Sequence, residues 1–547
     1  MNFTKYRPFQ PIPMSQRSWP DKLITKAPMW CSVDLRDGNQ ALEIPMSLEQ
    51  KIEFFEHLVA IGFKEIEIGF PAASETEYLF TRTLIEQNLI PKDVTIQVLT
   101  QSRDQIIKRT FESLQGVHRA IVHLYNSTST LQRAVVFQKN KEEIKEIAVS
   151  GAKLLKEYAQ QYGPERFLFE YSPESFTGTE IDYAADICNA VLDVWQPTPQ
   201  HKSIINLPAT VEMSTPNIYA DQIETMCKTI KGRQNVIISL HTHNDRGTAV
   251  AAAELGLMAG ADRVEGTLFG NGERTGNSDV LTLAMNLYSQ GINPQLDFSV
   301  IDKIVEIYQD MTHMVVHPRH PYAGELVFTA FSGSHQDAIN KGIAQLNKDA
   351  SYWEVPYLPI DPSDIGRSYE AIIRINSQSG KGGIAYVLEK KYGLQLPKKM
   401  RQHFSQIIKD ASDKLHKEML VEEIYDLFCK EYINVASPVE LVSYKEESGT
   451  ETNVSAVLII NGVQKTISGS GNGLLSAFCS GLIAATQKEF EIKYYTEHSL
   501  EYGAKSSAIT YMEVIDKAGE LYFGAGVDSN ISRSSILAII SAANKIL

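Results

Sequence analysis

The sequence predicts a (β/α)8 barrel as its main domain, and three observations support that prediction. Between residue 29 and about residue 290, eight short runs rich in β-branched and aromatic residues alternate with segments whose apolar residues recur at helical spacing. Eight such pairs in about 260 residues match the size and repeat number of a barrel, whereas an open doubly wound sheet seldom has so regular a count. Polar residues also collect at the ends of the predicted strands, where a barrel carries its chemistry.

The predicted strands are short and apolar, and each one precedes a helical segment. In two of these segments, 47–62 and 141–159, the apolar side chains fall on one helical face. The barrel domain is assigned to residues 29–310. Its eight strands are predicted at 29–35, 64–70, 94–100, 119–125, 166–172, 204–213, 235–243 and 262–270.

The chain outside the barrel divides into three further parts. The N-terminal arm, residues 1–28, has four prolines in its first 22 residues and is expected either to lie extended on another surface or to be disordered. Residues 311–432 begin with a loop-rich stretch (311–397), continue into helices over about 398–432, and are interpreted as linker subdomains. Residues 433–547 form a C-terminal domain.

The C-terminal domain repeats one βββα module. Three strand candidates precede a helix in the first copy, and three more precede a helix in the second. Gly469 and Gly471 correspond to Gly524 and Gly526 at an offset of 55 residues. Two such modules related by a pseudo-twofold axis can hold a small ligand between them. The elements are strands 439–445, 454–460 and 463–469 with helix 474–486, then strands 491–497, 507–515 and 520–526 with helix 534–544.

Composition and charge argue against several classes of protein. The chain has 547 residues with 52 Lys and Arg against 66 Asp and Glu, a formal net charge of −14 that is spread along its length. Nucleic acid is therefore not an expected partner. No apolar run nears the roughly 18–20 residues of a membrane span, and the proline-rich start does not match a signal peptide. The five cysteines are widely spaced without a C-x-x-C pair, which favours a cytoplasmic location.

The pair His241 and His243 indicates a metal site. Alternate side chains of a strand share a face, with β-carbons roughly 6–7 Å apart, so both imidazoles point the same way. An H-x-H pair alone is a weak indication and could be two structural histidines. Its place at a predicted strand end, with Asp37 after another strand and Asn277 as an oxygen donor, favours a divalent cation. Such a ligand set suits Zn²⁺, Mn²⁺, Mg²⁺ or Co²⁺ and leaves positions open for a chelating substrate.

Arg36 and Glu174 are candidate catalytic residues at two other strand ends. An arginine captures carboxylates or stabilises a developing oxyanion beside a metal, although Arg36 could simply pair with Asp37. Glu174 lies where a general base, or a carboxylate orienting one, is needed, although it could be a charge on the rim. The glycine-rich segment 270–276 matches neither phosphate-loop fingerprint, and it is either a plain turn or a contact for the anionic end of a cofactor.

Six motifs together resemble the α-isopropylmalate synthase family, in its long form with a proline-rich arm. The first two alone would also fit the wider group of metal-dependent acyl-CoA condensing enzymes and lyases, which includes homocitrate synthase, citramalate synthase and hydroxymethylglutaryl-CoA lyase. The arm, the linker motifs and the doubled module narrow the resemblance to the leucine-pathway enzyme. The motifs are DLRDGNQ (34–40), LHTHNDRG (240–247), FGNGERTGN (269–277), SGSHQDAINKG (332–342), VPYLPIDPSDIGR (355–367) and INSQSGKGG (375–383).

This resemblance implies a Claisen-type condensation of acetyl-CoA with 3-methyl-2-oxobutanoate, followed by thioester hydrolysis to 2-isopropylmalate and CoA. The reaction is the first committed step of leucine biosynthesis. An α-keto acid chelates a divalent ion through a carboxylate oxygen and its keto oxygen, and the ion polarises that carbonyl. The expected cofactor is Mg²⁺, Mn²⁺ or Zn²⁺, with K⁺ as a candidate activator. The family's metal ligands correspond to Asp37, His241, His243 and Asn277.

The resemblance also implies roles in substrate binding. Arg36 would stabilise the alkoxide as it develops and would contact the keto acid together with His241. Thr210 would hold the carboxylate of the keto acid.

Proton abstraction from the acetyl methyl group needs a positioned base that is shielded from water. The resemblance points to His335, assisted by Tyr357 and Glu174. His335 and Tyr357 fall in the linker, which in this family covers the active site of the partner subunit, so a homodimer is expected.

By the same resemblance, the C-terminal domain would be a leucine-binding regulatory domain, and leucine would inhibit the enzyme. The ligand is expected near Gly469, Gly471, Gly524 and Gly526.

Two rival interpretations remain. A citramalate or homocitrate synthase would differ only in the pocket for the keto acid side chain. A metal-containing amino-acid sensor without catalysis belongs to another class of protein, and the presence of Arg36, Glu174 and His335 argues against it.

Overall fold

The computed structural model describes residues 5, 9–14, 16–330, 333–346, 352–371, 384, 388–389, 391–415, 419, 421–500 and 506–547. The chain divides into two compact units. The first comprises residues 1–327 and 346–368, and the second comprises residues 328–345 and 369–547. The motif at 375–383 lies outside the described residues.

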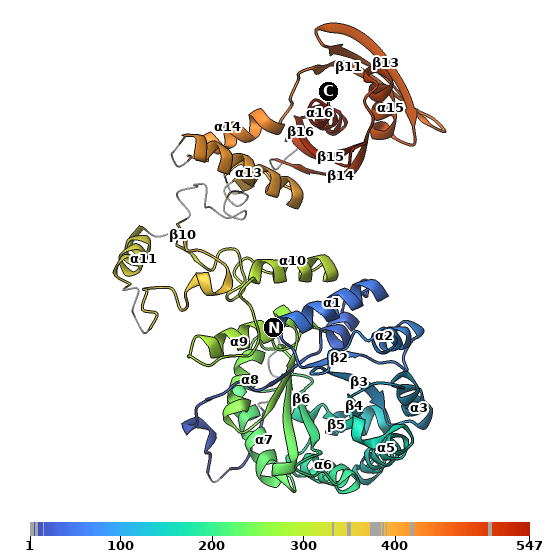
Figure 1. The fold of residues 1–547 in the computed structure, drawn as a ribbon, viewed down its shortest axis with the longest axis vertical. Helices are drawn as coiled ribbons and strands as arrows, with labels where there is room; N and C mark the ends of the chain where they lie inside the picture. Colours follow the sequence, from blue (N-terminus) through green and yellow to red (C-terminus); the bar gives the residue numbers. More distant parts are fainter. Residues whose placement is uncertain are drawn as a thin grey trace. The chain divides into compact units, whose positions relative to one another are not determined.

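The first unit is a closed barrel of eight parallel strands, as the sequence predicts. Strand β1 pairs with β8 to close the ring, and helices surround it (Figure 1). The strands are β1 (Met29–Ser32), β2 (Glu65–Gly69), β3 (Thr95–Gln101), β4 (Ala120–Ser127), β5 (Phe167–Glu174), β6 (Ser203–Ala209), β7 (Val236–Thr242) and β8 (Arg263–Gly266). The helices are α1 (Leu48–Ile61), α2 (Glu75–Glu86), α3 (Asp104–Ser113), α4 (Thr130–Gln132), α5 (Lys141–Tyr162), α6 (Ile181–Trp195), α7 (Pro216–Thr229), α8 (Ala249–Met258), α9 (Val280–Tyr288) and α10 (Ile301–Thr312).

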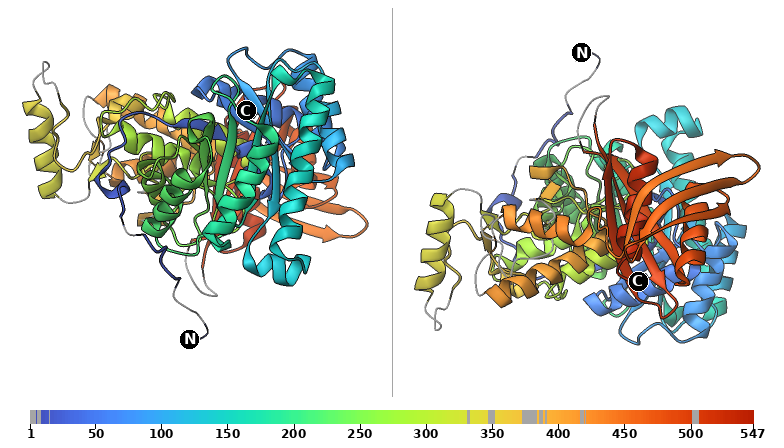
Figure 2. Two further views of the ribbon diagram at one scale, coloured as in Figure 1. Left: turned by 90° about the horizontal axis from the view of Figure 1, so that it is seen from below. Right: turned by 90° about the horizontal axis from the view of Figure 1, so that it is seen from above.

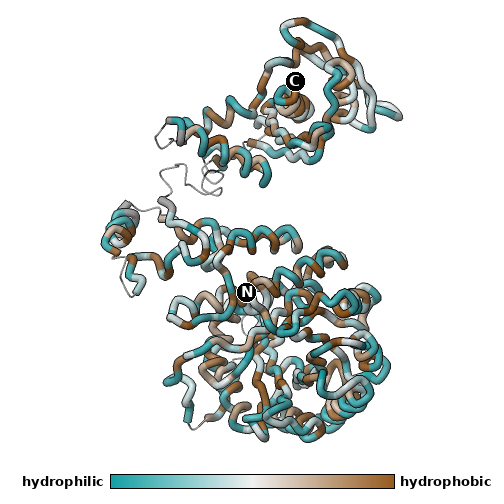
Figure 3. The backbone as a smooth tube through the Cα atoms, viewed as in Figure 1, coloured by the Kyte–Doolittle hydropathy of each residue, from teal (hydrophilic) through white to brown (hydrophobic). Residues whose placement is uncertain are grey.

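Local signals fix where the barrel helices begin and end. Ser47 caps α1 in a capping box with Gln50, and Asn140 caps α5 in the same way with Glu143. Gly62 caps the C-terminus of α1 with a φ of 115°, a backbone conformation that is energetically unfavourable for residues with a β-carbon. Along the helices, hydrophobic and hydrophilic residues alternate at short intervals (Figure 3), which is typical of helices that cover a sheet with one face.

Three of the predicted strands end three or more residues earlier in the structure. Strand β1 ends at Ser32 because the chain turns into η3 (Asp34–Gly38), a π-helical turn of a kind often found at functional sites. Strand β6 ends at Ala209, so Thr210 follows the strand instead of lying within it. Strand β8 ends at Gly266, where the short helix η8 (Leu268–Gly270) soon follows.

Part of the N-terminal arm packs against the barrel. The indole of Trp19 is buried and donates a hydrogen bond of 2.9 Å to Asp221 in α7. Arg17 forms an ion pair of 2.8 Å with the same carboxylate. One buried acceptor on α7 therefore holds both residues of the arm.

The second unit begins with a small element that the sequence analysis did not predict. Helix α11 (Gly333–Gln345) lies between β9 (Thr329–Ala330) and β10 (Glu370–Ala371), which pair in parallel. The expectation that His335 lies in a loop is wrong, because it is in α11. The predicted helices at about 398–432 are α13 (Lys398–Leu415) and α14 (Val421–Tyr432).

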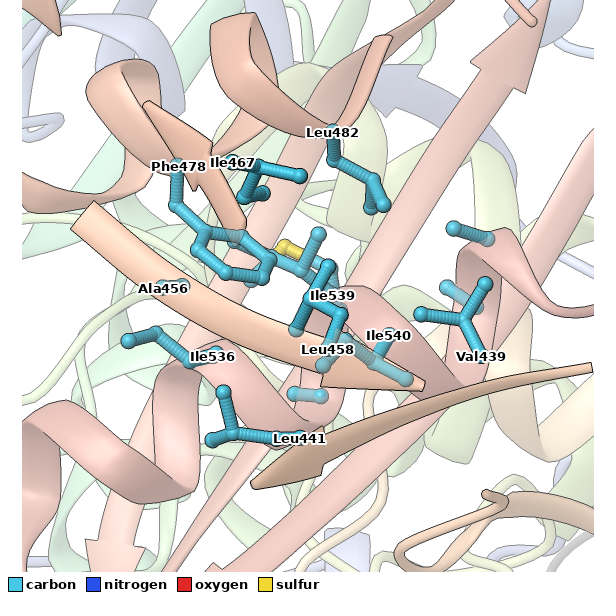
Figure 4. Close-up of a cluster of buried hydrophobic side chains, with 14 of the residues drawn as sticks. Val439, Leu441, Ala456, Leu458, Ile467, Phe478, Leu482, Ile536, Ile539 and Ile540 are labelled. Carbon is cyan, nitrogen blue, oxygen red and sulfur yellow. The ribbon is translucent and has the colours of Figure 1, made fainter. Parts of the chain in front are cut away.

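The C-terminal domain has the predicted two βββα modules, each with a three-stranded antiparallel sheet and one helix (Figure 2). Side chains from both sheets and both helices form one buried apolar cluster (Figure 4). Burial of this shared apolar surface stabilises the two modules as one domain. The elements are β11 (Val439–Ser448), β12 (Thr452–Ile460), β13 (Val463–Gly471) and α15 (Leu474–Thr486), then β14 (Phe490–Ser499), β15 (Ala508–Asp516), β16 (Leu521–Asp528) and α16 (Ile531–Ala543).

Among the described residues, the helical pair α13 and α14 packs against the outer face of the second module and not of the first. Phe404 and Phe428 of the helices pack in a second apolar cluster with Ile509, Tyr511 and Phe523 of β15 and β16. Lys399 adds an ion pair of 3.0 Å with Glu513. Strand β15 is thus buried on both faces, whereas β12 alternates between buried and more exposed residues.

The repeated glycines lie where each sheet meets its helix. A β-carbon on Gly526 would lie 1.9 Å from the Ser534 carbonyl oxygen, and one on Gly469 would lie 2.2 Å from the Ala477 carbonyl oxygen. A side chain at either position would push the helix from the strand. Close helix packing therefore explains the repeated glycine pattern.

In the part of the chain that the structure describes, no helix combines the length and apolar character needed to cross a membrane.

Candidate active site

A cavity of about 180 Å³ opens at the carboxyl end of the barrel strands. Its wall is mostly polar and is built from strand ends and from the loops that follow them. The predicted residues Arg36, Asp37, Glu174, Thr210 and both histidines of the H-x-H pair line it together. The full lining is Arg36, Asp37, Gln40, Leu99, His123, Tyr125, Ser172, Glu174, Asn206, Pro208, Thr210, His241, His243, Glu273 and Arg274.

Three side chains converge on one point of this cavity. His241 Nε2 lies 3.1 Å from Asp37 Oδ2, His243 Nε2 lies 3.7 Å from the same oxygen, and the two Nε2 atoms are 3.3 Å apart. A tetrahedral ion with ligands at about 2.0–2.2 Å separates its ligand atoms by about 3.3–3.6 Å. The triangle therefore has the size and the donor types of a face of a divalent-metal site, and all three residues are buried.

Asn277 lies beside this triangle, because its backbone forms an isolated bridge with His243. Its amide nitrogen donates to the Asn271 carbonyl at 2.9 Å, while its buried Oδ1 has no hydrogen-bond partner among the described residues. A buried carbonyl oxygen without a partner is costly. A side-chain carbonyl oxygen is a ligand type that suits a hard cation, and the role of Asn277 as a metal ligand stays a prediction.

The local charges are unbalanced in favour of a cation. Burial alone would lower the pKa of His241, but hydrogen bonds to Asp37 and Glu265 outweigh it and raise this pKa to about 9. Burial and the charge on His241 lower the pKa of His243 to about 4. Burial would raise the pKa of Asp37, but Arg36 and the histidines hold it well below its usual range. At neutral pH His241 is therefore an imidazolium, with Nδ1 facing Glu265 and Nε2 facing Asp37.

Arg36 is held against the metal triangle. Its guanidinium pairs with Asp37 at 3.3 Å and with the fully buried Glu67. Glu67 is held in turn by His123 Nδ1 at 2.8 Å and Gln97 at 3.1 Å. Because Arg36 still lines the cavity, its charge faces the space beside the metal triangle.

Glu174 and Thr210 face the cavity from adjacent strand ends. Ser127 donates its hydroxyl hydrogen to Glu174 Oε2 across the β4 and β5 ends. The backbone N–H of Ser175 donates to Thr210 Oγ1 at 2.9 Å. The Thr210 hydroxyl is already an acceptor in this bond, so its own hydrogen is available to an acceptor such as a carboxylate.

Arg274 ties three rim loops together, and the sequence analysis did not single it out. It donates to Asp245 Oδ1 at 2.8 Å and to the carbonyl oxygen of Thr210. Asp245 in turn accepts from the Glu212 N–H at 2.9 Å. The loops after β6, β7 and β8 are therefore joined around Thr210.

A closed ring of hydrogen bonds and one ion pair, between Arg36 and Asp37, forms the floor of the cavity. From Asp37 it runs through Arg36, Glu67, His123, Ser172, Asn206, Glu265 and His241 back to Asp37. The sequence analysis missed Glu67, His123 and Glu265, which lie within strands and not at their ends. Charged residues at alternate positions of otherwise apolar strands, as in "RVEG" (263–266) and "EIEIG" (65–69), were the available signal.

A second group of potential metal ligands already surrounds a positively charged side chain, Arg263. The group consists of His123, Glu170 and Glu265. Arg263 Nη1 lies 2.7 Å from Glu265 and 3.4 Å from Glu170. Burial and the neighbouring Glu265 raise the pKa of Glu170 well above its usual range, which favours its neutral form. The fully buried guanidinium takes the place that an ion would need.

The two predicted linker residues are divided between the units. His335 lies in α11 of the second unit and is exposed. Tyr357 belongs to the first unit, is 62% exposed and has a left-handed backbone with φ of 66°. Their catalytic roles stay predictions, as does the leucine site near the four glycines.

Comparisons with known proteins give a consistent result over the whole chain. Residues 27–307 match the HMGL-like family model, residues 325–389 match "Alpha-isopropylmalate synthase, post-catalytic domain-like", and residues 418–547 match the LeuA allosteric (dimerisation) domain. The 2-isopropylmalate synthase of Acetoanaerobium sticklandii is 60% identical over 100% of this chain and 97% of its own length. That of Clostridium acetobutylicum is 56% identical over 100% and 99%.

Among solved structures, the hydroxymethylglutaryl-CoA lyase of Pseudomonas aeruginosa aligns with a TM-score of 0.44 and 17% identity, over 53% of this chain and 95% of that one.

Proposed function

This chain belongs to the 2-isopropylmalate synthase family, and on that premise we propose that it condenses acetyl-CoA with 3-methyl-2-oxobutanoate. Hydrolysis of the thioester then yields 2-isopropylmalate and CoA, as the first committed step of leucine biosynthesis. The observation that carries the proposal is the convergence of Asp37, His241 and His243 in a cavity that Arg36 and Thr210 also line.

Asp37, His241 and His243 would hold a divalent cation, with Asn277 as a further oxygen ligand. When bound, the cation supplies an electrophile that polarises the keto group of the substrate. The mixed donor set suits Zn²⁺, Mn²⁺ or Mg²⁺, and K⁺ is a candidate activator. The size of the ligand triangle and the unpartnered oxygen of Asn277 support this assignment.

Arg36 and Thr210 would bind the keto acid. The Thr210 hydroxyl has a hydrogen to donate to the carboxylate, because Ser175 fills one of its acceptor positions. Arg36 would stabilise the negative charge that develops on the former keto oxygen. Its guanidinium is held in place by Asp37 and Glu67, so little ordering is needed during the reaction.

Glu174 would act in the removal of a proton from the acetyl methyl group, with His335 and Tyr357 as the linker residues that complete the base. The resulting carbon nucleophile attacks the keto carbon and forms the new carbon–carbon bond. Water then attacks the thioester carbonyl, the carbon–sulfur bond breaks, and CoA leaves as its thiol. The hydroxyl of Ser127 supports the role of Glu174, because it orients one carboxylate oxygen and leaves the other for the substrate.

A panel of keto acids, assayed by detection of the free thiol of CoA, tests the proposed reaction. We expect the highest kcat/KM with 3-methyl-2-oxobutanoate. Best turnover with pyruvate would instead indicate a citramalate synthase, and best turnover with 2-oxoglutarate a homocitrate synthase. Metal uptake without release of CoA from acetyl-CoA, whichever keto acid is supplied, would favour a sensor without catalysis.

Leucine is the proposed effector, and a homodimer is the proposed assembly. The match to the LeuA allosteric (dimerisation) domain supports both proposals. The same assay with added leucine or valine tests the effector, and sedimentation tests the assembly. Inhibition that is equal for the two amino acids, or a monomer at assay concentrations, would contradict these proposals.

A further inference from the structure

His241 and Glu265 are direct partners in the register of β7 and β8. Their side chains both enter the barrel interior, where His241 Nδ1 lies 2.8 Å from Glu265 Oε2. The opposite ring nitrogen, Nε2, faces Asp37 and His243. The sheet itself therefore places a carboxylate behind the imidazole, on the side away from the proposed metal.

Glu265 is held rigidly by donors on both of its oxygens. Arg263 Nη1 and Gln97 Nε2 donate to Oε1 at 2.7 and 2.9 Å, and Asn206 donates to Oε2 at 3.1 Å. Arg263 is itself fully buried and is held by Glu65 at 2.6 Å. A carboxylate with three donors in addition to His241 has little freedom to turn.

We propose that Glu265 is a positioning residue for the metal centre, and that it accepts the Nδ1–H of His241 so that the lone pair of Nε2 faces the ion. This inference rests on the proposed function, because it presupposes the metal site. A carboxylate behind a metal-bound histidine fixes the tautomer and ring orientation and strengthens the ligand. Loss of such a partner typically weakens metal binding by about 10–100-fold.

His243 lacks this support, which makes the contribution of Glu265 separable. Its buried Nδ1 has no hydrogen-bond partner within the described residues. Of the two imidazoles, only His241 has a carboxylate at Nδ1. A change at Glu265 should therefore alter one metal ligand and leave the other unchanged.

Two substitutions test the proposal by different changes: one removes the charge of Glu265, and the other keeps the charge but shortens the side chain. In Glu265→Gln, Arg263 and Gln97 select the amide oxygen, so the amide NH₂ faces His241 and favours the tautomer with a hydrogen on Nε2. In Glu265→Asp, the charge beside Arg263 remains, but the side chain is one methylene shorter and withdraws from Nδ1. Glu65→Gln is the matched control, because Glu65 also binds Arg263 but belongs to β2 and pairs with no proposed ligand.

The readouts are Zn²⁺ affinity of the full chain by competition with a chromophoric chelator, the d–d absorption spectrum of the Co²⁺ form, and Tm of the metal-free protein. We expect both Glu265 variants to bind Zn²⁺ about 10–100-fold more weakly. Their Co²⁺ spectra should shift. The Zn²⁺ affinity of Glu65→Gln should stay within about twofold of that of the parent protein, and its Co²⁺ spectrum should be unchanged. If Glu265→Gln does not fold, Glu265→Asp carries the test.

Unchanged affinity and spectra in the Glu265 variants would overturn the proposal, and so would an equal loss in Glu65→Gln. His241→Ala separates this result from a failure of the proposed function. If His241→Ala binds Zn²⁺ as tightly as the parent, the metal site itself is wrongly assigned. If His241→Ala loses binding but the Glu265 variants do not, only the positioning role is wrong.

Discussion

His241 and His243 bring their Nε2 atoms to within 3.3 Å of each other, yet their Nδ1 atoms are in unlike surroundings. Glu265 binds the first at 2.8 Å, while the second is buried without a partner among the residues described. Two histidines at alternate positions of one motif are therefore unequal as metal ligands.

Replacement of Asp37 by Asn should remove the negatively charged ligand that lies beside both histidines. We expect Zn²⁺ binding to be lost and turnover to fall by more than about 100-fold. Chelator treatment of the parent protein should have the same effect on turnover, and added metal should reverse it. Asp297→Asn, an exposed carboxylate elsewhere in the same unit, is the control. Full activity of chelator-stripped protein would contradict the metal assignment.

Glu174→Gln should lower kcat by about 10²–10⁴-fold, because general acid–base catalysis contributes that range. Steady-state kinetics with saturating keto acid measure the effect. Ser127→Ala should cause a smaller loss, since it removes only the hydroxyl that orients Glu174. If Ser127→Ala were the more harmful change, the role of Glu174 would need revision.

Thr210→Val should raise KM for the keto acid by about 10- to 150-fold and leave KM for acetyl-CoA unchanged. The substitution keeps the shape of the side chain and removes the hydroxyl donor, and one lost hydrogen bond to a charged group costs about 1.5–3 kcal/mol. Thr210→Ser retains the hydroxyl and is the matched control. An equal rise in both KM values would indicate a general disturbance of the cavity.

Gly526→Ala should destabilise the C-terminal domain. The new β-carbon would lie 1.9 Å from the Ser534 carbonyl oxygen, so α16 must move away from β16. Overpacking of this kind typically costs about 1–3 kcal/mol. Gly473→Ala is the control, because no described atom lies within 4 Å of its β-carbon position. Differential scanning calorimetry should show a lower Tm for the first variant alone. Equal Tm values would show that the helix gives way at little cost.

Acidification should destabilise the barrel partly through His57. Burial, with a smaller effect of Lys303, lowers the pKa of His57 from 6.5 to about 4. Between pH 6.5 and 4, His57 is therefore protonated in the unfolded chain but neutral in the folded chain. The contribution of neutral His57 to the free energy of unfolding is complete above pH 6.5 and is lost as the pH falls towards 4. His57→Gln should reduce the fall in Tm between pH 6.5 and 4.5. Because the ring is partly exposed, we expect an effect on the order of 1 kcal/mol. Parallel pH profiles for parent and variant would count against this assignment.

The strands of the barrel could be predicted because β-branched runs and helical periodicity alternate so regularly. Their ends could not, since Val33, Leu35 and Leu268 look like strand residues but follow the point where the chain turns at the rim. Helix α11 was missed because its glycines and polar residues leave it with few apolar side chains.

The candidate site was predictable where polar residues stand at strand ends, as for Asp37 and His243. Glu265 and His123 were missed because each lies inside an apolar strand, and only the closed barrel brings them under the same cavity. Residue spacing does not identify His335 or Tyr357 as catalytic residues, and their roles are inferred from the family resemblance alone.

Helices α13 and α14, which pack against β15 and β16, make the second module less tolerant of substitution than the first. Asn453 and Tyr511 hold equivalent places, because each pairs with the residue between the repeated glycines, Ser470 and Ala525 respectively. Asn453 is exposed and Tyr511 is buried. Polar side chains are therefore tolerated on the outer face of the strands in the first module, whereas α13 and α14 cover the equivalent face of the second. Sequence divergence between homologues should therefore concentrate in the first copy.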